Sequence, residues 1–273
     1  MTRLKPCRNI VGCALLTLFF LTASMSLARR SFAEELAQRQ LPVETHKPMY
    51  FIWLLDDGLH SAEAKFQMSF KTRLGTVKRL PGTRASNLPL YFGYTQKSFW
   101  EISKKSAPFR ESSYNPEVFA VYIKENPELG ARFNLTFGAE HESNGMGGGD
   151  SRSWNRAYMQ PSYERDLNDD YRGLIAFKVW RAFRVAEENI DIRDYYGVFE
   201  ATAGVAKKGW FKLSATGRKG KKGGALQADL TTNFEPKNRP FDFYLQYWRG
   251  EGESLINYNR HTTNWGAGMM LRR

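Results

Sequence analysis

Seven consecutive residues alternate between polar and apolar side chains: Lys65-Phe66-Gln67-Met68-Ser69-Phe70-Lys71. Because successive side chains of a β-strand point to opposite faces, this alternation predicts a strand with one apolar face. Similar, looser runs occupy residues 132–137, 173–183, 209–217, 225–230, 242–248 and 265–271, with turn-forming segments such as 125–130 and 234–240 between runs. Counting from Tyr50, we expect about twelve strands of roughly ten residues, enough for each tilted strand to cross a hydrocarbon layer.

The composition narrows the class of protein. The chain has 273 residues, of which 42% are hydrophobic and 25% charged, and these values exclude a disordered chain and a collagen. The mean hydropathy of −0.53 excludes a helical membrane protein with several spans. The net charge of +12 makes an anionic partner plausible: nucleic acid, a phospholipid surface or lipopolysaccharide phosphates.

Aromatic residues make up 14% of the chain and gather near the ends of the expected strands. The clusters are Tyr50, Phe51 and Trp53; Tyr91, Tyr94, Phe99 and Trp100; and Tyr244, Tyr247 and Trp248. Aromatic girdles at both interfaces are typical of outer-membrane barrels, so the clusters favour a barrel over a soluble sandwich.

The N-terminus has the order of a secretory signal peptide, expected over residues 1–33 with cleavage after Ala28 or Ala33. Its apolar run, residues 10–21, is too short to span a bilayer as a helix, and both cysteines, Cys7 and Cys13, lie within residues 1–33. Cleavage after Ala33 removes five basic residues and no acidic one, so the net charge falls from +12 to +7. We expect a periplasmic segment at 34–49, a barrel at 50–273 and, because the chain is exported, no nucleic-acid partner.

The segment 140–145 (Glu-His-Glu-Ser-Asn-Gly), followed by a glycine-rich loop and residues 151–156 (Ser-Arg-Ser-Trp-Asn-Arg), carries the candidate chemistry. His141 and Ser143 share one face of a strand, and a hairpin centred near Gly148 places Asn155 opposite His141, with Cβ atoms about 5 Å apart. Ser143 can then act as nucleophile, His141 as its base and Asn155 as the group that orients the ring. The residues alone leave a structural histidine and a turn serine as alternatives.

The chain also resembles a known family, the calcium-dependent outer membrane phospholipase A of Gram-negative bacteria. The similarity runs from about Tyr50 to Leu271, and its motifs occur at 65–67, 94–98, 108–111, 141–145, 151–156 and 252–256. The resemblance implies an all-β, twelve-stranded antiparallel transmembrane barrel in the outer membrane, with the active site on its outer wall towards the outer leaflet. It implies hydrolysis of phospholipids and lysophospholipids at either acyl position and a homodimer as the active form.

The resemblance assigns the site residues one by one. The catalytic serine, histidine and asparagine fall on Ser143, His141 and Asn155, and the backbone N–H of Gly145 contributes to the oxyanion hole. Ca²⁺ is implied as the cofactor, bound by the Ser151 hydroxyl, the Met146 carbonyl and Ser106 of the partner subunit. A further calcium site falls on Glu188, and Gln96 matches a glutamine that hydrogen-bonds across the dimer.

Some residues depart from the family pattern and leave alternatives. Asp150 is either a new calcium ligand or a solvated turn residue, and its residue type favours the turn. Glu188 is longer than the aspartate it matches, which puts that calcium site in question. The basic residues 218–222 suit lipopolysaccharide phosphates or a solvated hairpin tip equally.

Topology offers a further expectation, because every second connection of an even-stranded barrel lies at the same end. Ser106, the 145–151 loop and Glu188 all fall in such connections. The rival from another class is a non-enzymatic barrel, a porin or adhesin on the same scaffold. The preferred acyl position and the signal that activates the enzyme are not encoded in these motifs.

Overall fold

The computed structural model describes residues 42–55, 63–79, 86–232 and 240–272. The expected signal peptide and its cleavage sites, and most of the expected turn at 234–240, lie outside these residues. Within them, the strands are β1 (Val43–Thr45), β2 (Tyr50–Leu55), β3 (Glu63–Arg79), β4 (Ser86–Trp100), β5 (Phe109–Asn126), β6 (Ala131–Ser143), β7 (Ser153–Asp166), β8 (Tyr171–Phe183), β9 (Phe199–Lys207), β10 (Phe211–Lys219), β11 (Gly224–Thr232), β12 (Phe241–Glu251) and β13 (His261–Leu271).

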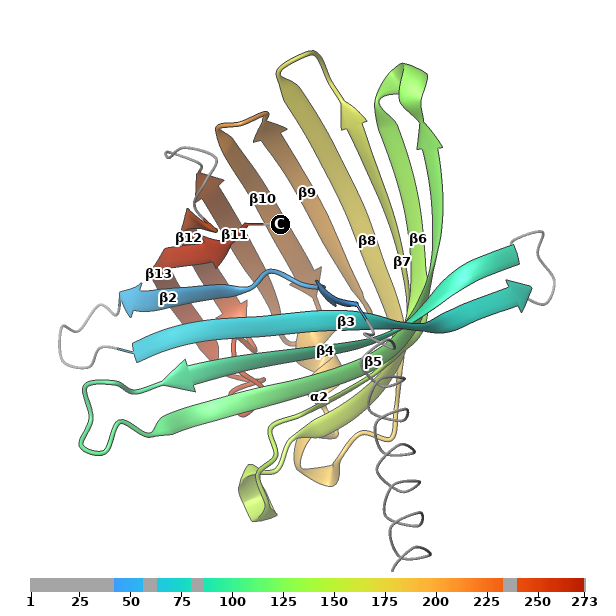
Figure 1. The fold of residues 1–273 in the computed structure, drawn as a ribbon. Coiled ribbons are helices and arrows are strands. Elements are labelled where there is room, and N and C mark those ends of the chain that lie inside the picture. The colour runs from blue at the N-terminus through green and yellow to red at the C-terminus, as the bar shows by residue number, and fades with distance from the viewer. Residues whose placement is uncertain (1–41, 56–62, 80–85, 233–239, 273) are drawn as a thin grey trace, which may run out of the picture. The chain divides into compact units, whose positions relative to one another are not determined.

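Strands β2–β13 form a closed antiparallel barrel, which confirms the architecture that the aromatic clusters favour and the family resemblance implies. Each strand pairs with the next in the chain, and β13 pairs back with β2, which closes the sheet (Figure 1). The short strand β1 pairs with β3 beyond the end of β2, so residues 43–45 also pack on the barrel. The expected count of twelve strands is therefore confirmed, although several strands are longer than ten residues.

The helices are short and lie in connections: the 3-10 turns η1 (Pro127–Leu129), η2 (Gly148–Asp150) and η3 (Glu187–Asn189), and the α-helix α2 (Ile192–Tyr196). None of the helices in the described ranges is both long and apolar enough to cross a membrane.

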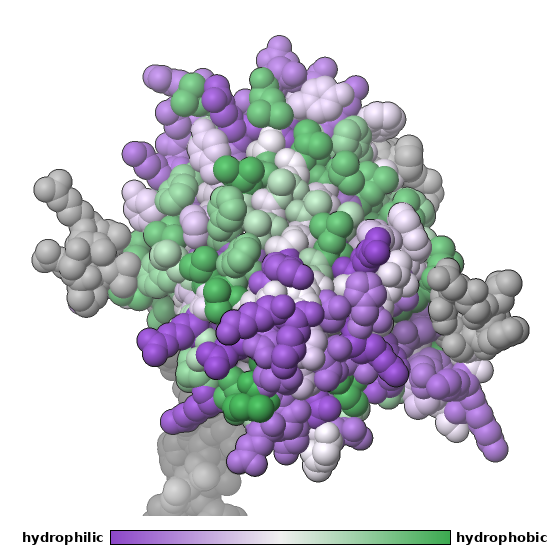
Figure 2. All heavy atoms as spheres, turned by 180° about the vertical axis from the view of Figure 1, so that it is seen from behind, coloured by the Kyte–Doolittle hydropathy of each residue, from purple (hydrophilic) through white to green (hydrophobic). Residues whose placement is uncertain are grey.

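The outer wall of the barrel is apolar. Large side chains that point outward and stay exposed are Trp53, Met68, Phe70, Val118, Met159, Ile175, Phe177, Val179, Leu213, Leu226, Phe243, Trp265 and Met269. In Figure 2 the hydrophobic residues of one face gather in a band between hydrophilic residues. An exposed apolar wall of this extent is what a lipid-facing surface requires, because hydrocarbon cannot hydrate polar side chains.

The lumen holds buried ion pairs around a cavity of about 670 Å³. Glu117 lies 2.7 Å from Lys47 and 2.9 Å from His46, both of which enter the lumen from the segment between β1 and β2. Glu140 pairs with Arg156 at 3.0 Å and with Lys178 at 2.7 Å. Buried charges require such partners, and the paired side chains fill space that an open diffusion channel would need.

Connections alternate between the two ends of the barrel. We call one end the long-loop end; its described connections are residues 101–108, 144–152, 184–198, 220–223 and 252–260. These connections bond to one another and to the strands: Tyr258 Oη donates to Asp191 Oδ1 at 2.6 Å, and Ile256 N donates to Glu111 Oε1 of β5 at 2.7 Å. Burial, together with the bond to Asp191, raises the pKa of Tyr258 to about 12, so the phenol stays protonated and keeps donating.

Candidate active site on the outer wall

The register of the β6–β7 hairpin brings His141 and Asn155 together. The two residues are paired directly, as the hairpin centre near Gly148 predicts, and Ser143 pairs with Ser153. His141 Nδ1 lies 3.1 Å from Asn155 Oδ1. Asn155 Nδ2 donates to the Arg184 carbonyl at 3.0 Å, so the connection after β8 fixes which amide oxygen faces the ring.

Ser143 lies two residues from His141, about 7 Å along the strand and on the same face. Within the described part of the chain, its hydroxyl makes no hydrogen bond with the imidazole. The Ser143 side chain is half-buried and lies on the face of the sheet that carries His141 and Asn155. Because the strand fixes both backbones, the distance between Ser143 Oγ and the His141 imidazole depends on the rotamers of the two side chains.

These three side chains face outward, away from the lumen. Their neighbours in sequence, Glu140, Glu142 and Arg156, point inward and form ion pairs there. Because side chains alternate across a strand, His141, Ser143 and Asn155 lie on the lipid-facing wall, with Ser143 at the end of β6 and Asn155 two residues into β7. All three are therefore at the long-loop end of the barrel.

Asn144, to which the sequence motif assigned no role, organises the loop that follows Ser143. Its buried side chain donates to the Asp150 carbonyl at 2.7 Å and accepts from Met146 N at 3.3 Å and Arg152 N at 3.0 Å. Its backbone N–H donates to the Arg152 carbonyl at 3.1 Å. One side chain thus fixes both ends of residues 144–152, and an asparagine directly before a glycine is the only sequence signal of this role.

Gly145 has a left-handed backbone conformation, with φ of +69°. A Cβ atom there would lie 2.9 Å from the ring of Tyr114, which pairs with Ser143 from β5. Within the described residues the Gly145 N–H has no acceptor. The position therefore needs glycine, and it presents an unpaired backbone donor two residues after Ser143.

The other predicted metal ligands lie in connections of the same end. Met146 and Ser151 are half-buried in the 144–152 loop, while Asp150 is exposed and offers only its carbonyl to Asn144. Ser106 is exposed in the β4–β5 connection, with φ of +67°. Glu188 is exposed in η3.

Asn189, next to Glu188, ties this connection to the start of β7 and was missed by the sequence analysis. The fully buried amide accepts from Ser153 N at 3.0 Å and donates to the Ser153 carbonyl at 3.2 Å. Ala186 N donates to the same carbonyl at 2.9 Å. The pairing holds η3 beside the candidate site, and no local pattern around residue 189 indicates it.

Gln96 is on the outer wall of β4, where it pairs with Met68. Its side chain accepts from Tyr94 Oη and donates to Ser98 Oγ, both at 3.1 Å, and Ser98 Oγ lies 2.8 Å from Ser112 Oγ. Polar atoms on a lipid-facing wall need such partners.

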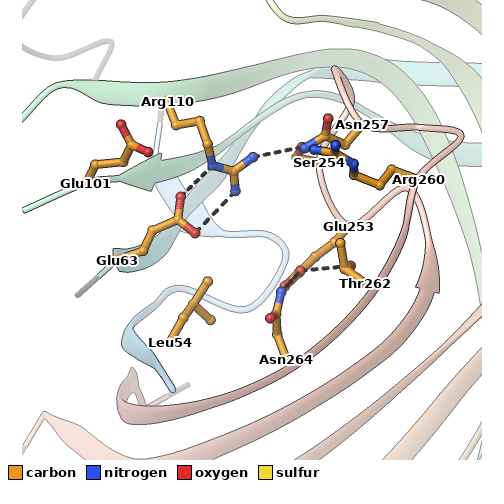
Figure 3. Close-up of a pocket in the computed structure, with 10 residues that line it drawn as sticks. All are labelled: Leu54, Glu63, Glu101, Arg110, Glu253, Ser254, Asn257, Arg260, Thr262 and Asn264. Atoms are coloured by element: carbon orange, nitrogen blue, oxygen red, sulfur yellow. Dashed lines mark hydrogen bonds and ion pairs between the residues drawn. The ribbon is translucent and has the colours of Figure 1, made fainter. Parts of the chain in front are cut away.

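A separate cavity of about 300 Å³ at the long-loop end contains none of the triad (Figure 3). Several of its charged side chains bond to their neighbours: Arg110 to Glu63 at 2.6 and 3.2 Å and to Ser254 at 3.4 Å, and Glu253 to Asn264. Glu253 also accepts from Lys65 at 2.9 Å. These bonds connect β3 and β5 to the β12–β13 connection.

Comparisons with known proteins show the family of the chain. Residues 29–271 match the phospholipase A1 family. The phospholipase A1 of Klebsiella pneumoniae is 34% identical over 212 residues, covering 77% of this chain and 70% of that protein; that of Escherichia coli K12 is 34% identical over the same length, covering 77% and 69%.

Solved structures extend the similarity to the fold. Outer membrane phospholipase A from Escherichia coli superposes with a TM-score of 0.72 at 29% identity, over 86% of this chain and 93% of that one. The Salmonella typhi outer membrane phospholipase dimer with bound calcium gives 0.71 at 29% identity, over 88% and 96%.

The closed barrel with an apolar outer wall defines a Gram-negative outer-membrane protein of the transmembrane β-barrel class. The chain belongs to the phospholipase A1 family of ester hydrolases.

Proposed function

We propose that this chain hydrolyses acyl ester bonds of phospholipids and lysophospholipids, at either acyl position, with Ser143, His141 and Asn155 as a catalytic triad supported by Ca²⁺. The observation that carries the proposal is the 3.1 Å contact between His141 Nδ1 and Asn155 Oδ1 beside Ser143 on the lipid-facing wall. A triad on this wall faces lipid rather than water, so it is placed to contact the ester groups of outer-leaflet lipids and not a water-soluble substrate.

In the proposed reaction Ser143 Oγ attacks the acyl carbonyl carbon while its proton passes to His141 Nε2. His141 then gives that proton to the departing alcohol oxygen, which leaves an acyl ester on Ser143. Water, deprotonated by His141, attacks this ester and releases the fatty acid, and the proton returns to Ser143 Oγ. Throughout, the His141 Nδ1–H donates to Asn155 Oδ1 and so keeps Nε2 available as the base.

The residues present suit a calcium ion. The Met146 carbonyl and the Ser151 hydroxyl have no hydrogen-bond partner among the described residues, and both offer oxygen, the ligand that Ca²⁺ prefers. No cluster of three or more histidine, cysteine or acidic side chains suited to a metal occurs in the described ranges, which disfavours a transition-metal site. Bound there with Ser106 of the partner subunit, Ca²⁺ supplies positive charge to the oxyanion that the Gly145 N–H binds. Glu188 is proposed as a ligand of a further calcium site.

A homodimer is part of the same proposal, because Ser106 is a ligand only across subunits and Gln96 is assigned to the contact between them. The Salmonella typhi relative supports it, since that protein is a dimer with bound calcium. The proposal also includes the orientation of the barrel in the membrane: its long-loop end faces the cell exterior, so the triad lies at the outer leaflet.

The test is fatty-acid release from detergent-dispersed phosphatidylethanolamine by the purified full chain, with Ca²⁺ and then with EDTA. Ser143→Ala abolishes turnover if Ser143 is the nucleophile. Ser153→Ala is the matched control, because Ser153 is paired with Ser143 on the same face and uses only its backbone to bind Asn189. Full activity of Ser143→Ala would refute the assignment of Ser143 as the nucleophile. No activity of the unmutated chain at any calcium concentration would favour the hypothesis of a non-enzymatic porin or adhesin.

A further inference from the structure

Arg181 is a charged side chain on the lipid-facing wall. It lies on β8 between the exposed, outward-pointing residues Val179 and Phe183. It is exposed, and no carboxylate in the described part of the chain pairs with it. An unpaired arginine is unfavourable in the hydrocarbon layer but is tolerated near the interface, where its long side chain reaches lipid phosphates.

The position of Arg181 along the barrel matches that of the triad. Arg181 is two residues from the end of β8, and Asn155 is two residues from the start of β7, both at the long-loop end. The triad row reads His141, Asn155, Phe183 across β6, β7 and β8, and the adjacent row reads Ala139, Ala157, Arg181. Arg181 therefore belongs to the row next to the triad.

The neighbours of Arg181 in its own row, on β7 and β6, have small side chains. Ala139 and Ala157 are both exposed and carry only a methyl group. Two strand spacings of about 4.8 Å and four residues of about 3.4 Å separate the Cα atoms of Ser143 and Arg181, which makes about 17 Å. Each side chain reaches part of this way, and the glycerol backbone of a lipid, which joins the ester carbonyl to the phosphate, spans the remaining gap.

We propose that Arg181 binds the phosphodiester of the glycerophospholipid whose ester lies at Ser143. Guanidinium binds phosphate oxygens through paired, charge-assisted hydrogen bonds, and a lipid held at both points presents its ester at a fixed distance from the nucleophile. This inference rests on the proposed function and adds to it a contact that selects phosphate-bearing substrates.

The test compares two substrates in the same detergent: phosphatidylethanolamine and a diacylglycerol, which has the same esters and no phosphate. For Arg181→Gln we expect a KM about tenfold higher for phosphatidylethanolamine, because one charged contact is lost, with kcat nearly unchanged and no effect on diacylglycerol. Arg181→Lys should restore part of the loss, since it keeps the charge without the paired geometry.

Arg165→Gln is the matched control, because Arg165 is an exposed arginine on the outer wall of β7 at the opposite end of the barrel. We expect its KM for both lipids to equal that of the unmutated chain. The heat-dependent gel mobility of each variant reports whether the barrel is folded.

Two results would overturn the inference: an unchanged KM for phosphatidylethanolamine in a folded Arg181→Gln variant, or an equal rise for both lipids. A rise that also appears in Arg165→Gln would mean that the arginines act on bulk lipid rather than on the substrate, and would overturn it too. Failure of the unmutated chain to hydrolyse either lipid would instead refute the proposed function itself.

Discussion

Asn155 connects His141 to the backbone of Arg184: its amide oxygen faces His141 Nδ1 at 3.1 Å, and its amide nitrogen donates to the Arg184 carbonyl at 3.0 Å. The two bonds fix the orientation of the amide, because exchange of the oxygen and nitrogen would break both. The imidazole orientation in β6 therefore depends on the connection that follows β8.

The first prediction concerns this amide. We expect Asn155→Ala to lower kcat about 10- to 100-fold, because His141 loses the acceptor that selects its tautomer while the nucleophile remains. Asn155→Asp should retain more activity, since a carboxylate accepts the same N–H. Steady-state kinetics on phosphatidylethanolamine measure both, and equal losses in the two variants would contradict an orienting role.

The second prediction concerns Gly145. We expect Gly145→Ala to lower kcat about 10²- to 10³-fold, because the left-handed backbone is strained by a Cβ that meets the Tyr114 ring, and the displaced N–H no longer binds the oxyanion. Gly149→Ala is the matched control: Gly149 has ordinary φ and open space around a Cβ. An active Gly145→Ala enzyme would show that another donor binds the oxyanion.

The third prediction concerns the loop held by Asn144. Asn144→Ala removes three side-chain hydrogen bonds that close residues 144–152. We expect the calcium concentration for half-maximal activity to rise about tenfold or more, because the ordering of the loop must then be achieved on binding. Asp150→Ala should not change this concentration if Asp150 is a turn residue, and a rise there would identify it as a calcium ligand instead.

The fourth prediction concerns the buried pair of Lys65 and Glu253, whose charged atoms lie 2.9 Å apart. We expect Lys65→Met to destabilise the barrel by about 3–5 kcal/mol, because it leaves a buried carboxylate without its main partner. Lys71→Met, which breaks the more exposed pair with Glu44, should cost less than about 1 kcal/mol. Thermal loss of the folded band in gels compares the two variants.

The same pair gives a pH dependence. Burial raises the pKa of the Glu253 carboxyl, but the charge of Lys65 and its hydrogen bonds outweigh burial and hold that pKa below its usual range. The carboxyl therefore contributes stability above the unfolded pKa of about 4.3 and loses it as the pH falls through the lower folded pKa. Acid titration of the unmutated chain should show this loss below about pH 4, and Lys65→Met should lack it.

Local sequence patterns predicted the strands of the barrel wall and the pairing in the β6–β7 hairpin. The alternation at 65–71 lies within β3, ahead of the register shift between Arg73 and Gly75, and the hairpin centre near Gly148 correctly predicted that His141 pairs with Asn155. Both depend on strand periodicity and on one short loop, which neighbouring residues determine. The basic run 218–222 was less informative, because Arg218 points inward and donates to the carbonyls of Glu251 and Gly252 at 2.9 Å.

By itself the sequence determined the period of the strands, the apolar face that they share, and the common face of His141, Ser143 and Asn155. The tertiary structure decided the contacts between residues far apart in the sequence: the amide of Asn189 with Ser153, the charge of Lys65 with Glu253, and the place of Arg181 in the row beside the triad. The reason is physical: alternation repeats every two residues and is local, whereas contacts across several strands depend on the registers of all the pairs between them and on closure of the barrel.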